Sequence, residues 1–360
     1  DEALDQTIAE PEIIPNKKTE LEDVYAPFDN HEILPQKLQN REIRFIDAIS
    51  EAIEISMKNH PNLVLMGQDI AEYGGAFKIT EGFVEKFGKK RVRNTPLCEA
   101  AIVGSGLGLS INGYKSMVEM QFADFVTEGF NQIINNLAKT HYRWNQNADV
   151  VVRMPTGAGT GAGPFHSQSN EAWFTKTPGL KIAYPAFPDD AKGLLIQSFE
   201  DPNPVLFFEH KKLYRSLKGN VPEGFYTTPF GKARKVKEGN ELTIITYGLG
   251  VHIALEFAEK NPEISLEIVD LRTLIPLDTE TIYESVKKCN KVIILHEDTL
   301  TCGFGAELSA LISEHCFEDL DAPILRVASM DTPIPFNKKL EDQFMPNEEL
   351  AEAVDKILKY

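Results

Sequence analysis

The stretch Asn94-Thr-Pro-Leu-Cys-Glu-Ala-Ala-Ile-Val-Gly-Ser-Gly-Leu-Gly-Leu-Ser110 is the part of the sequence that decides the fold. Its proline ends any preceding helix, so a helix is predicted from about Cys98 to Ser110, with Glu99 in the first turn. One face of this helix carries almost no side chain, because small residues recur there at every fourth position. These residues are Ala100, Gly104 and Gly108. Since a helical glycine costs about 1 kcal/mol relative to alanine, the pattern predicts close packing beside Glu99, which is either a solvated or a functional carboxylate.

The length and composition of the chain predict a soluble protein with two domains. It has 360 residues, of which 42% are hydrophobic and 25% are charged, and this is the balance of an ordinary globular protein. It contains no run of eighteen apolar residues, and its acidic N-terminal segment lacks the basic and apolar regions of a signal peptide. We therefore expect no membrane-spanning helix and a cytoplasmic location.

Charge and cysteine content narrow the classes of partner and metal. A net charge of -17 repels the phosphates of nucleic acids and suits a basic protein partner instead. The four cysteines form no C-x-x-C pair and no zinc-binding spacing, so we expect reduced thiols without disulfides or structural zinc. They are Cys98, Cys289, Cys302 and Cys316.

Residues 1–40 differ in composition from the rest of the chain. They hold ten acidic residues, four prolines and no glycine, without a sustained helical or strand period. This composition predicts an acidic, extended linker or tail. Because the chain opens on Asp1 rather than on methionine, we hypothesise that the segment is the cut end of a longer polypeptide, which the mass of the native gene product would test.

From Arg41 onward, apolar strands alternate with helical stretches. An amphipathic helix with apolar residues from Ile43 to Met57 precedes the first strand. Apolar runs predict strands at 63–66, 116–120, 150–154, 181–184 and 205–208, and then at 242–246, 266–269, 292–295 and 324–327. Such alternation is typical of parallel sheets covered by helices on both faces. A polar, turn-rich interval from Lys211 to Gly231 separates the two series, so we predict two α/β domains, at 41–225 and 226–360.

Neither domain carries a common nucleotide-binding fingerprint. The glycine-rich stretches 104–108 and 156–163 match neither G-x-G-x-x-G nor G-x-x-x-x-G-K-[ST], which argues against a nicotinamide dehydrogenase and a P-loop enzyme. The second stretch follows a predicted strand and leads directly to His166. It is either a flexible surface loop or a mobile segment that presents His166 to a cleft at the end of the strand.

Six blocks of sequence, taken in order, form a familiar pattern. They are Asn94–Glu99, Glu119–Asp124, His166–Ser169, Pro178–Ile182, Asp270–Pro276 and Ala322–Arg326. Together they resemble the β subunit of thiamine-diphosphate-dependent 2-oxo acid dehydrogenases, over a region that runs from about Arg41 to the C-terminus. The resemblance implies a transketolase-like pyrimidine-binding domain followed by a transketolase-type C-terminal domain.

The resemblance implies the β part of the decarboxylating first component, which oxidatively decarboxylates a 2-oxo acid and transfers the acyl group to lipoyl groups of an acyltransferase core. Asn94–Glu99, Gln121–Asp124 and Asp331–Pro335 are similar to branched-chain enzymes that act on 2-oxoisovalerate. Glu209–Arg215 and Val221–Gly224 are more similar to bacterial pyruvate dehydrogenase β subunits. A pyruvate dehydrogenase β subunit and a non-catalytic interaction subunit of the same fold are therefore the alternatives.

The resemblance also implies roles for individual residues. Glu99 would bind the pyrimidine ring nitrogen of thiamine diphosphate and favour the imino tautomer that removes the proton from the thiazolium carbon. Leu97 and Gln121 match cofactor-binding positions, and Phe125 would stack on the aminopyrimidine where branched-chain enzymes often have tyrosine. His166 matches a histidine beside the reacting carbon, where it would assist acyl transfer to a lipoyl group.

Metal sites and partners follow from the same resemblance. Potassium would bind, largely through main-chain oxygens, at Ser198, Asp201 and Asn203. Magnesium needs a Gly-Asp-Gly motif that this chain lacks, so an α subunit or α domain would hold it and the chain would be active only with that part. The implied assembly is an α2β2 heterotetramer docked to a lipoyl acyltransferase core, with homodimer contacts through the C-terminal domain. Residues 1–40 would then be the remnant of a fused α part.

Overall fold

A seven-stranded sheet forms the centre of the first domain in the computed structural model, which describes residues 2–36 and 39–360. In spatial order the sheet contains β12 (Thr273–Ile275), β6 (Lys181–Ala183), β7 (Val205–His210), β5 (Val150–Thr156), β4 (Lys115–Glu119), β2 (Leu63–Gly67) and β3 (Val92–Asn94). All neighbours pair in parallel except β12, which is antiparallel to β6. The carboxyl ends of the parallel strands therefore meet along one edge of the sheet.

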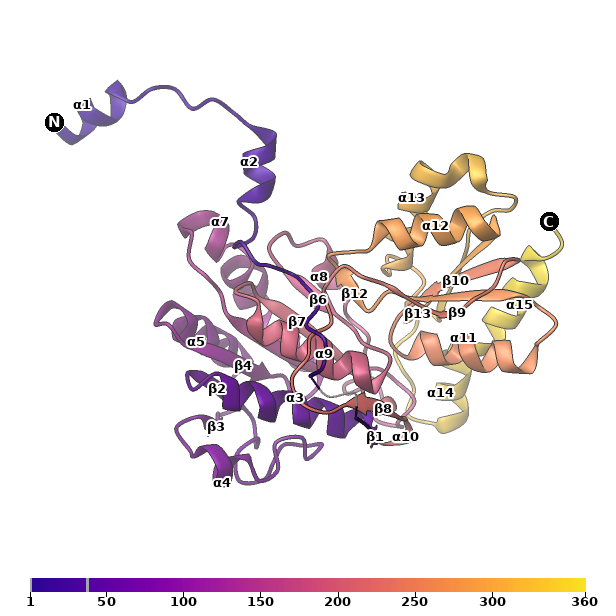
Figure 1. Ribbon diagram of the computed structural model, residues 1–360, viewed down its shortest axis with the longest axis horizontal. Helices are drawn as coiled ribbons and strands as arrows, with labels where there is room; N and C mark the ends of the chain where they lie inside the picture. The colour runs from indigo at the N-terminus through magenta and orange to yellow at the C-terminus, as the bar shows by residue number, and fades with distance from the viewer. Residues whose placement is uncertain (1, 37–38) are drawn as a thin grey trace.

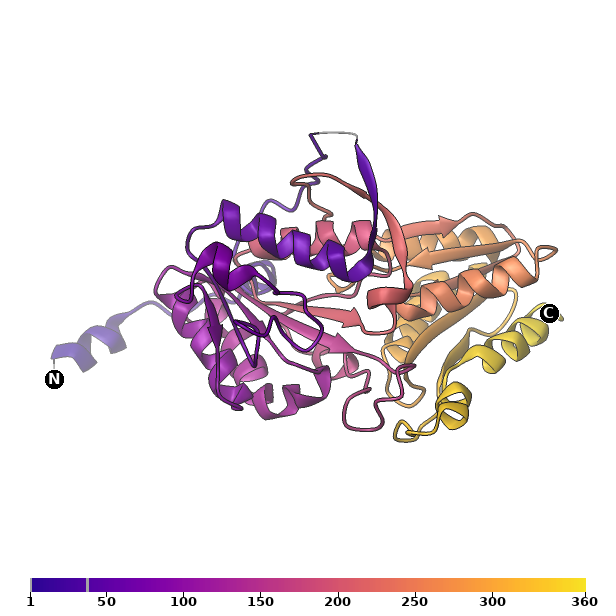
Figure 2. The same cartoon turned by 90° about the horizontal axis from the view of Figure 1, so that it is seen from below.

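Helices cover both faces of this sheet because its strands are apolar on both sides. On one face lie α3 (Phe45–Asn59) and α9 (Pro188–Glu200), and on the other lie α5 (Glu99–Ile111), α6 (Val126–Asn131) and the π-helical turn η2 (Gln132–Leu137) (Figure 2). Leu65 packs into the core under α3, whereas its neighbours Val64 and Met66 pack into the core under α5. Successive residues of a strand thus divide between two cores, as expected for a parallel sheet.

A five-stranded sheet forms the second domain and is also covered on both faces. Its spatial order is β14 (Leu325–Ser329), β13 (Val292–Thr299), β10 (Leu242–Thr246), β11 (Leu266–Asp270) and β9 (Arg234–Lys237). β9 runs antiparallel to β11, and the other pairs are parallel. On one face lie α12 (Thr279–Cys289) and α13 (Gly305–Cys316), and on the other lie α11 (Leu249–Lys260) and α15 (Asn347–Ile357) (Figure 1). The predicted pair of α/β domains with mostly parallel sheets is confirmed.

The remaining elements of the two domains are short. They are α4 (Phe83–Phe87), α7 (Thr140–Trp144), α8 (Ala172–Thr175), α10 (Leu213–Ser216), α14 (Lys338–Phe344), the 3-10 turns η1 (Ala123–Phe125) and η3 (Phe317–Asp319), and the antiparallel pair β1 (Asn40–Arg44) and β8 (Lys218–Pro222). None of the helices in the described ranges has the length and apolar character that crossing a membrane requires.

A strand that changes sheet joins the two domains. β12 follows β11 in the chain but pairs with β6 at the edge of the first sheet. Next to this pair, the main-chain amide of Tyr184 donates to the carbonyl of Arg272 at 2.8 Å. The ring of Tyr184 also lies 5.3 Å from that of Tyr247, which follows β10 in the second domain. Main-chain hydrogen bonds and contacts between aromatic rings therefore join the two domains.

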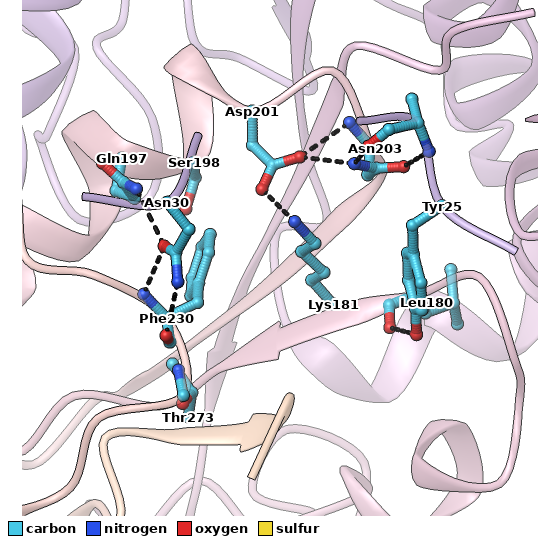
Figure 3. A network of polar contacts seen from close by, with 12 residues as sticks. Tyr25, Asn30, Leu180, Lys181, Gln197, Ser198, Asp201, Asn203, Phe230 and Thr273 are labelled. Atoms are coloured by element: carbon cyan, nitrogen blue, oxygen red, sulfur yellow. Dashed lines mark hydrogen bonds and ion pairs between the residues drawn. The ribbon is translucent and has the colours of Figure 1, made fainter. Parts of the chain in front are cut away.

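The N-terminal segment is anchored to the body, although the sequence predicts an extended linker or tail. Its two short helices, α1 (Glu2–Ala9) and α2 (Lys17–Glu22), bury no residue and were not predicted. Further on, the amide of Asn203 accepts from the main-chain N–H of Ala26 at 2.7 Å and donates to its carbonyl at 3.0 Å (Figure 3). We call residues 25–33 the strap, because they are fastened to the first domain. Residues 1, 37 and 38 of the predicted linker lie outside the described residues.

A second clamp holds the other end of the strap. Asn30 accepts from the main-chain N–H of Phe230 at 2.9 Å and donates to its carbonyl at 2.7 Å (Figure 3). Gln197 of α9 also donates to the Asn30 side chain, at 3.0 Å. The strap therefore connects α9 of the first domain with the segment that leads into the second.

The packing contact of α5 is made by Gly106, and not by the predicted face that includes Gly104 and Gly108. A Cβ atom added to Gly106 would lie 3.1 Å from side-chain atoms of both Ser116 and Val118. A Cβ atom added to Gly108 would meet no atom of the described residues within 4 Å. The missing side chain at Gly106 therefore allows α5 to approach the sheet, while the predicted face is turned away from it.

We predict that Gly106→Val destabilises the chain by about 1 to 3 kcal/mol more than Gly108→Val, because only the first valine overpacks the contact between α5 and β4. The intrinsic helix propensity of valine is the same in both positions of the helix, so Gly108→Val is a matched control. Urea unfolding followed by circular dichroism measures the difference. Equal losses of unfolding free energy would contradict the assignment of Gly106 to the sheet contact.

Candidate functional site

Four residues predicted to bind the cofactor or act in catalysis lie along one edge of the first sheet, because each follows a parallel strand. Glu99 starts α5 after β3, Gln121 and Phe125 follow β4, and His166 lies in the loop after β5. In open parallel sheets the carboxyl edge is where loops from neighbouring strands converge and where ligands bind. The topology therefore gathers these four residues from three crossovers.

Glu99 is nearly buried at the N-terminus of α5, with 9% of its surface exposed. The side-chain amide of Gln68 donates to its Oε1 at 2.9 Å, and Gln68 is itself buried directly after β2. Gln68 was not predicted as a site residue, although its place immediately after an apolar strand was a usable signal. Leu97, two residues before Glu99, is 81% exposed. This part of the site therefore combines an anchored carboxyl group with an uncovered apolar side chain.

Phe122, Phe125 and His166 form an aromatic corner. The ring centre of His166 lies 4.8 Å from that of Phe122 and 5.5 Å from that of Phe125, with both pairs of ring planes nearly perpendicular. The two phenylalanine rings are 5.9 Å apart, also edge to face. Such contacts restrict the orientation of the imidazole. The structure thus brings together the predicted residues Phe125 and His166 and adds Phe122, which was not predicted. Gln121, which precedes Phe122 in the chain, is half-buried.

Asp124 fastens the His166 loop to the turn after β4. Its Oδ1 accepts from the main-chain N–H of Ser167 at 3.2 Å and of Gln168 at 3.1 Å, and from the Gln168 side chain at 3.0 Å. Asn170 adds a bond from its side chain to the carbonyl of Ala123, at 2.9 Å. Because Asp124 is buried, these bonds are shielded from water, and they join the crossover after β4 to the one after β5.

A buried lysine lies behind the aromatic corner. Lys211 follows β7, and its ammonium group lies 5.8 Å from the ring centre of Phe122 and donates to the carbonyl of Gly157 at 2.6 Å. Burial lowers the pKa of Lys211 to about 8. At neutral pH the ammonium group of Lys211 therefore places a positive charge behind the aromatic corner. The chain as a whole is negatively charged, with a net charge of -17.

The strands under the site carry a buried ion cluster. Arg153 of β5 donates from Nε and Nη2 to both oxygens of Glu209, at 2.5 and 2.8 Å, and pairs through Nη1 with Glu119. The hydroxyl of Tyr214 donates to Glu209 at 2.6 Å. Burial raises the pKa of Glu119, although Arg153 opposes this. Since removal of one partner would leave a buried charge unpaired, the cluster fixes β4, β5 and β7 relative to one another.

A second group of carboxyls lies between the domains. The buried side chain of Glu171 accepts from the Tyr247 hydroxyl at 2.8 Å through Oε1, and its Oε2 has no hydrogen-bond partner among the described residues. Burial, and then the charge of Asp298, raise the pKa of Glu171 to about 8. Burial also raises the pKa of Asp298 to about 6. Sequence patterns gave no sign of this group, because its members are joined only by the contact between domains.

The side chains of the three residues predicted to bind potassium are bonded to protein groups. The hydroxyl of Ser198 donates to a main-chain carbonyl of α9 at 2.7 Å. Asp201 pairs with the ammonium group of Lys181 and accepts from Asn203 at 2.8 Å, while Asn203 also clamps the strap (Figure 3). These side chains do not fit a potassium ion, so an ion here would need main-chain oxygens. Across the described ranges, no group of three or more histidine, cysteine, aspartate or glutamate side chains is arranged to hold a metal ion.

Comparisons with known proteins agree with this architecture. Residues 41–216 match the family described as "Transketolase, pyrimidine binding domain", and residues 231–350 match "Transketolase, C-terminal domain". The 2-oxoisovalerate dehydrogenase subunit beta of Bacillus subtilis (strain 168) is 47% identical over 314 residues, which cover 86% of this chain and 96% of that protein. This chain belongs to the β-subunit family of 2-oxo acid dehydrogenases. The resemblance drawn from the six sequence blocks is thereby confirmed.

Other relatives of this β subunit show how broad the family is. The pyruvate dehydrogenase E1 component subunit beta of the same organism is 40% identical over 326 residues, which cover 89% of this chain and 99% of that protein. A solved structure described as "Split gene transketolase, inactive beta4 tetramer" superimposes with a TM-score of 0.70 at 24% sequence identity, covering 88% of this chain and 99% of that one. The last comparison shows the fold alone, and it supports the assignment of both domains to the transketolase type.

We predict that Glu171→Gln weakens the pH dependence of stability. Between pH 4.5 and about 8 native Glu171 keeps its proton while the unfolded chain loses it, so the unfolded state binds fewer protons and the free energy of unfolding falls as pH rises. The neutral glutamine removes this contribution, which is on the order of 2 kcal/mol. Urea unfolding of both proteins at about pH 5 and about pH 8 measures it. If both proteins lose the same free energy of unfolding between these pH values, Glu171 is not the group responsible.

Proposed function

We propose that this β subunit supplies half of the active site of a thiamine-diphosphate-dependent 2-oxoisovalerate dehydrogenase. The reaction is the oxidative decarboxylation of a branched-chain 2-oxo acid, with acyl transfer to the lipoyl groups of an acyltransferase core. The observation that carries the proposal is the convergence of nearly buried Glu99 and the His166 corner on the carboxyl edge of a transketolase-type sheet. The 47% identity to a 2-oxoisovalerate dehydrogenase subunit supports this substrate class.

Glu99 and Phe125 fit the pyrimidine half of thiamine diphosphate. When bound, this cofactor supplies a carbon centre that adds to the 2-oxo group and stabilises the negative charge left by decarboxylation. The carboxyl group of Glu99, held by Gln68 at 2.9 Å, would hydrogen-bond a ring nitrogen and hold the proton shared there. Half-buried Phe125 offers an aromatic face for stacking. Gln121 and exposed Leu97 would complete the contacts made by this chain.

His166 is proposed as the acid and base of acyl transfer. An imidazole takes up and releases a proton near neutral pH, which suits the protonation of a lipoyl sulfur. The ring is half-buried and held edge to face between Phe122 and Phe125. The Asp124 clamp on the two following residues limits movement of the main chain. The imidazole of His166 therefore has a restricted orientation, which favours proton transfer to a single position on the bound lipoyl group.

An α subunit or α domain is the proposed partner, and it would hold the magnesium ion and the diphosphate. The outer face of α5 suits such a partner because Ala101, Ser105 and Gly108 are exposed there, next to the exposed apolar side chains of Leu97 and Ile111. We propose an α2β2 heterotetramer with homodimer contacts through the second domain, active only as the assembly. Its proposed location is the cytoplasm, which suits four cysteines that are all unpaired.

Two alternatives remain as competing proposals. A pyruvate dehydrogenase β subunit is supported by the 40% identity to such a subunit. The two substrates differ by two methyl groups, and apolar pockets discriminate by about 1 to 3 kcal/mol per methylene group. A non-catalytic interaction subunit would keep the fold but would not need Glu99 or His166.

We also propose a potassium site on main-chain oxygens near Ser198, Asp201 and Asn203, and predict that potassium stabilises the chain. An ion that binds only the folded state raises the melting temperature, here by about 2 to 4 °C. Melting in potassium chloride is compared with melting in sodium chloride at equal ionic strength, which cancels general screening. Identical melting temperatures at all concentrations would contradict the site.

We predict that Glu99→Gln prevents productive cofactor binding and lowers 2-oxoisovalerate turnover at least about a hundredfold. Calorimetry with thiamine diphosphate and magnesium is done on the chain alone, on the chain assembled with its α partner, and on the assembled variant. Binding only in the assembly, and its loss in the variant, is the expected result. Tight binding to the chain alone would contradict the shared site. Full activity of both Glu99→Gln and His166→Ala in the assembly would favour the non-catalytic alternative.

A further inference from the structure

Two carboxylates of the second domain hold the glycine-rich loop that leads to His166. Glu341 of α14 accepts through Oε1 from the main-chain N–H of Gly159 at 2.8 Å, and through both oxygens from that of Gly161 at 3.1 and 3.0 Å. Glu297 of β13 accepts from the main-chain N–H of Ala158 at 2.6 Å. Figure 2 shows this loop of the first domain next to the yellow C-terminal segment. The loop was predicted as a flexible or mobile segment, yet three of its amides are bonded to buried side chains.

The glycines of the loop are needed for this arrangement. Gly157 has a φ of +91°, and a Cβ atom there would lie 2.0 Å from the imidazole of His210. Gly163 has a φ of +73°, and a Cβ atom there would lie 2.2 Å from the ring of Phe336 in the second domain. A residue with a side chain would be strained in both places and would collide with the neighbouring ring. The loop is therefore shaped to fit closely against His210 of the first domain and Phe336 of the second.

The two carboxylates are buried, so their bonds to the loop are shielded from water. Glu341 is 3% exposed and Glu297 is 5% exposed. Glu297 also pairs with Nε2 of buried His210 at 2.5 Å and accepts from the hydroxyl of Ser169 at 3.3 Å, just after His166. Although burial opposes it, the neighbouring His210 lowers the pKa of Glu297. Bonds from main-chain amides to an ionised carboxylate are among the stronger hydrogen bonds in proteins.

We propose that Glu341 and Glu297 are positioning residues for His166, and that they act from the second domain by holding the loop that carries it. The proposal rests on the proposed role of His166 in acyl transfer. The loop is held near its start by Glu297 and Glu341 and after His166 by Asp124. Between these points, the amide of His166 donates to the carbonyl of Gly163 at 3.3 Å. Loss of Glu341 frees the amides of Gly159 and Gly161 in the first part of the loop, so His166 would leave its place against Phe122 and Phe125 more often.

The chemical consequence of the proposal concerns one half of the reaction. Decarboxylation followed with an artificial dye as electron acceptor does not need proton transfer to a lipoyl sulfur, whereas acyl transfer does. A loosened His166 therefore slows acyl transfer relative to dye reduction. A general loss of folded enzyme would slow both to the same extent, so the ratio of the two rates separates positioning from stability.

Hydrogen exchange on the assembled complex tests the contact directly. In Glu341→Ala, the amides of the peptide that covers residues 157–168 are expected to exchange at least about tenfold faster than in the unmodified protein. Glu341→Gln keeps one acceptor oxygen without the charge, so an intermediate increase is expected. Asp342→Ala is the matched control, because Asp342 is the exposed next residue of the same helix and pairs only with Lys338 among the contacts described.

The same variants are then assayed in both half-reactions. Glu341→Ala is expected to lower the rate of acyl transfer relative to dye reduction by about tenfold, whereas Asp342→Ala leaves the ratio unchanged. An unchanged exchange rate in Glu341→Ala, or an unchanged ratio of the two rates, would overturn the proposal. An unmodified complex without dehydrogenase activity would instead refute the proposed function, and the exchange result would still report on the loop contact.

Discussion

Parallel pairing of β2, β4 and β5 between two helical layers is the constraint on which the candidate site depends. Because these strands point the same way, each must be followed by a crossover that begins at the same edge of the sheet. Gln68, Phe122 and the His166 loop are therefore neighbours although they are far apart in the chain. The Asp124 bonds to Ser167 and Gln168 then turn this shared location into a fixed geometry.

Buried charges in this protein are placed where elements must keep their positions. Arg153 links β5 to β4 and β7 through Glu119 and Glu209, and Lys211 bonds to the carbonyl of Gly157 in the glycine-rich loop. Each of these groups loses hydration on burial, and each recovers part of that loss through partners with fixed directions. Because removal of one partner would leave the other charge buried and unpaired, such networks favour one arrangement of the elements, which is what a site assembled from separate crossovers requires.

The fold was predictable from local patterns, whereas the contacts that shape the site were not. Apolar runs located the strands, and β10 has the predicted bounds, because a strand buried on both faces needs an apolar run of its own length. Motifs led to the proposal of Glu99 and His166 as site residues. Gln68, the Asn203 clamp on Ala26 and the Glu341 contact escaped prediction, because they join residues that no local period connects. The small-residue period in α5 identified a helix face, but it could not tell which face is turned to the sheet, and Gly106 makes that contact.

The exchange of β12 between sheets has a consequence for how the chain is made. The neighbour that completes the first sheet beside β6 is encoded about ninety residues later, within the second domain. During synthesis the edge of β6 therefore stays uncovered until much of the second domain has left the ribosome, and an uncovered apolar edge is a site of aggregation. A fragment that stops at the domain border keeps this edge exposed permanently. Each domain has its own sheet, but the first sheet is complete only when a strand of the second domain is present.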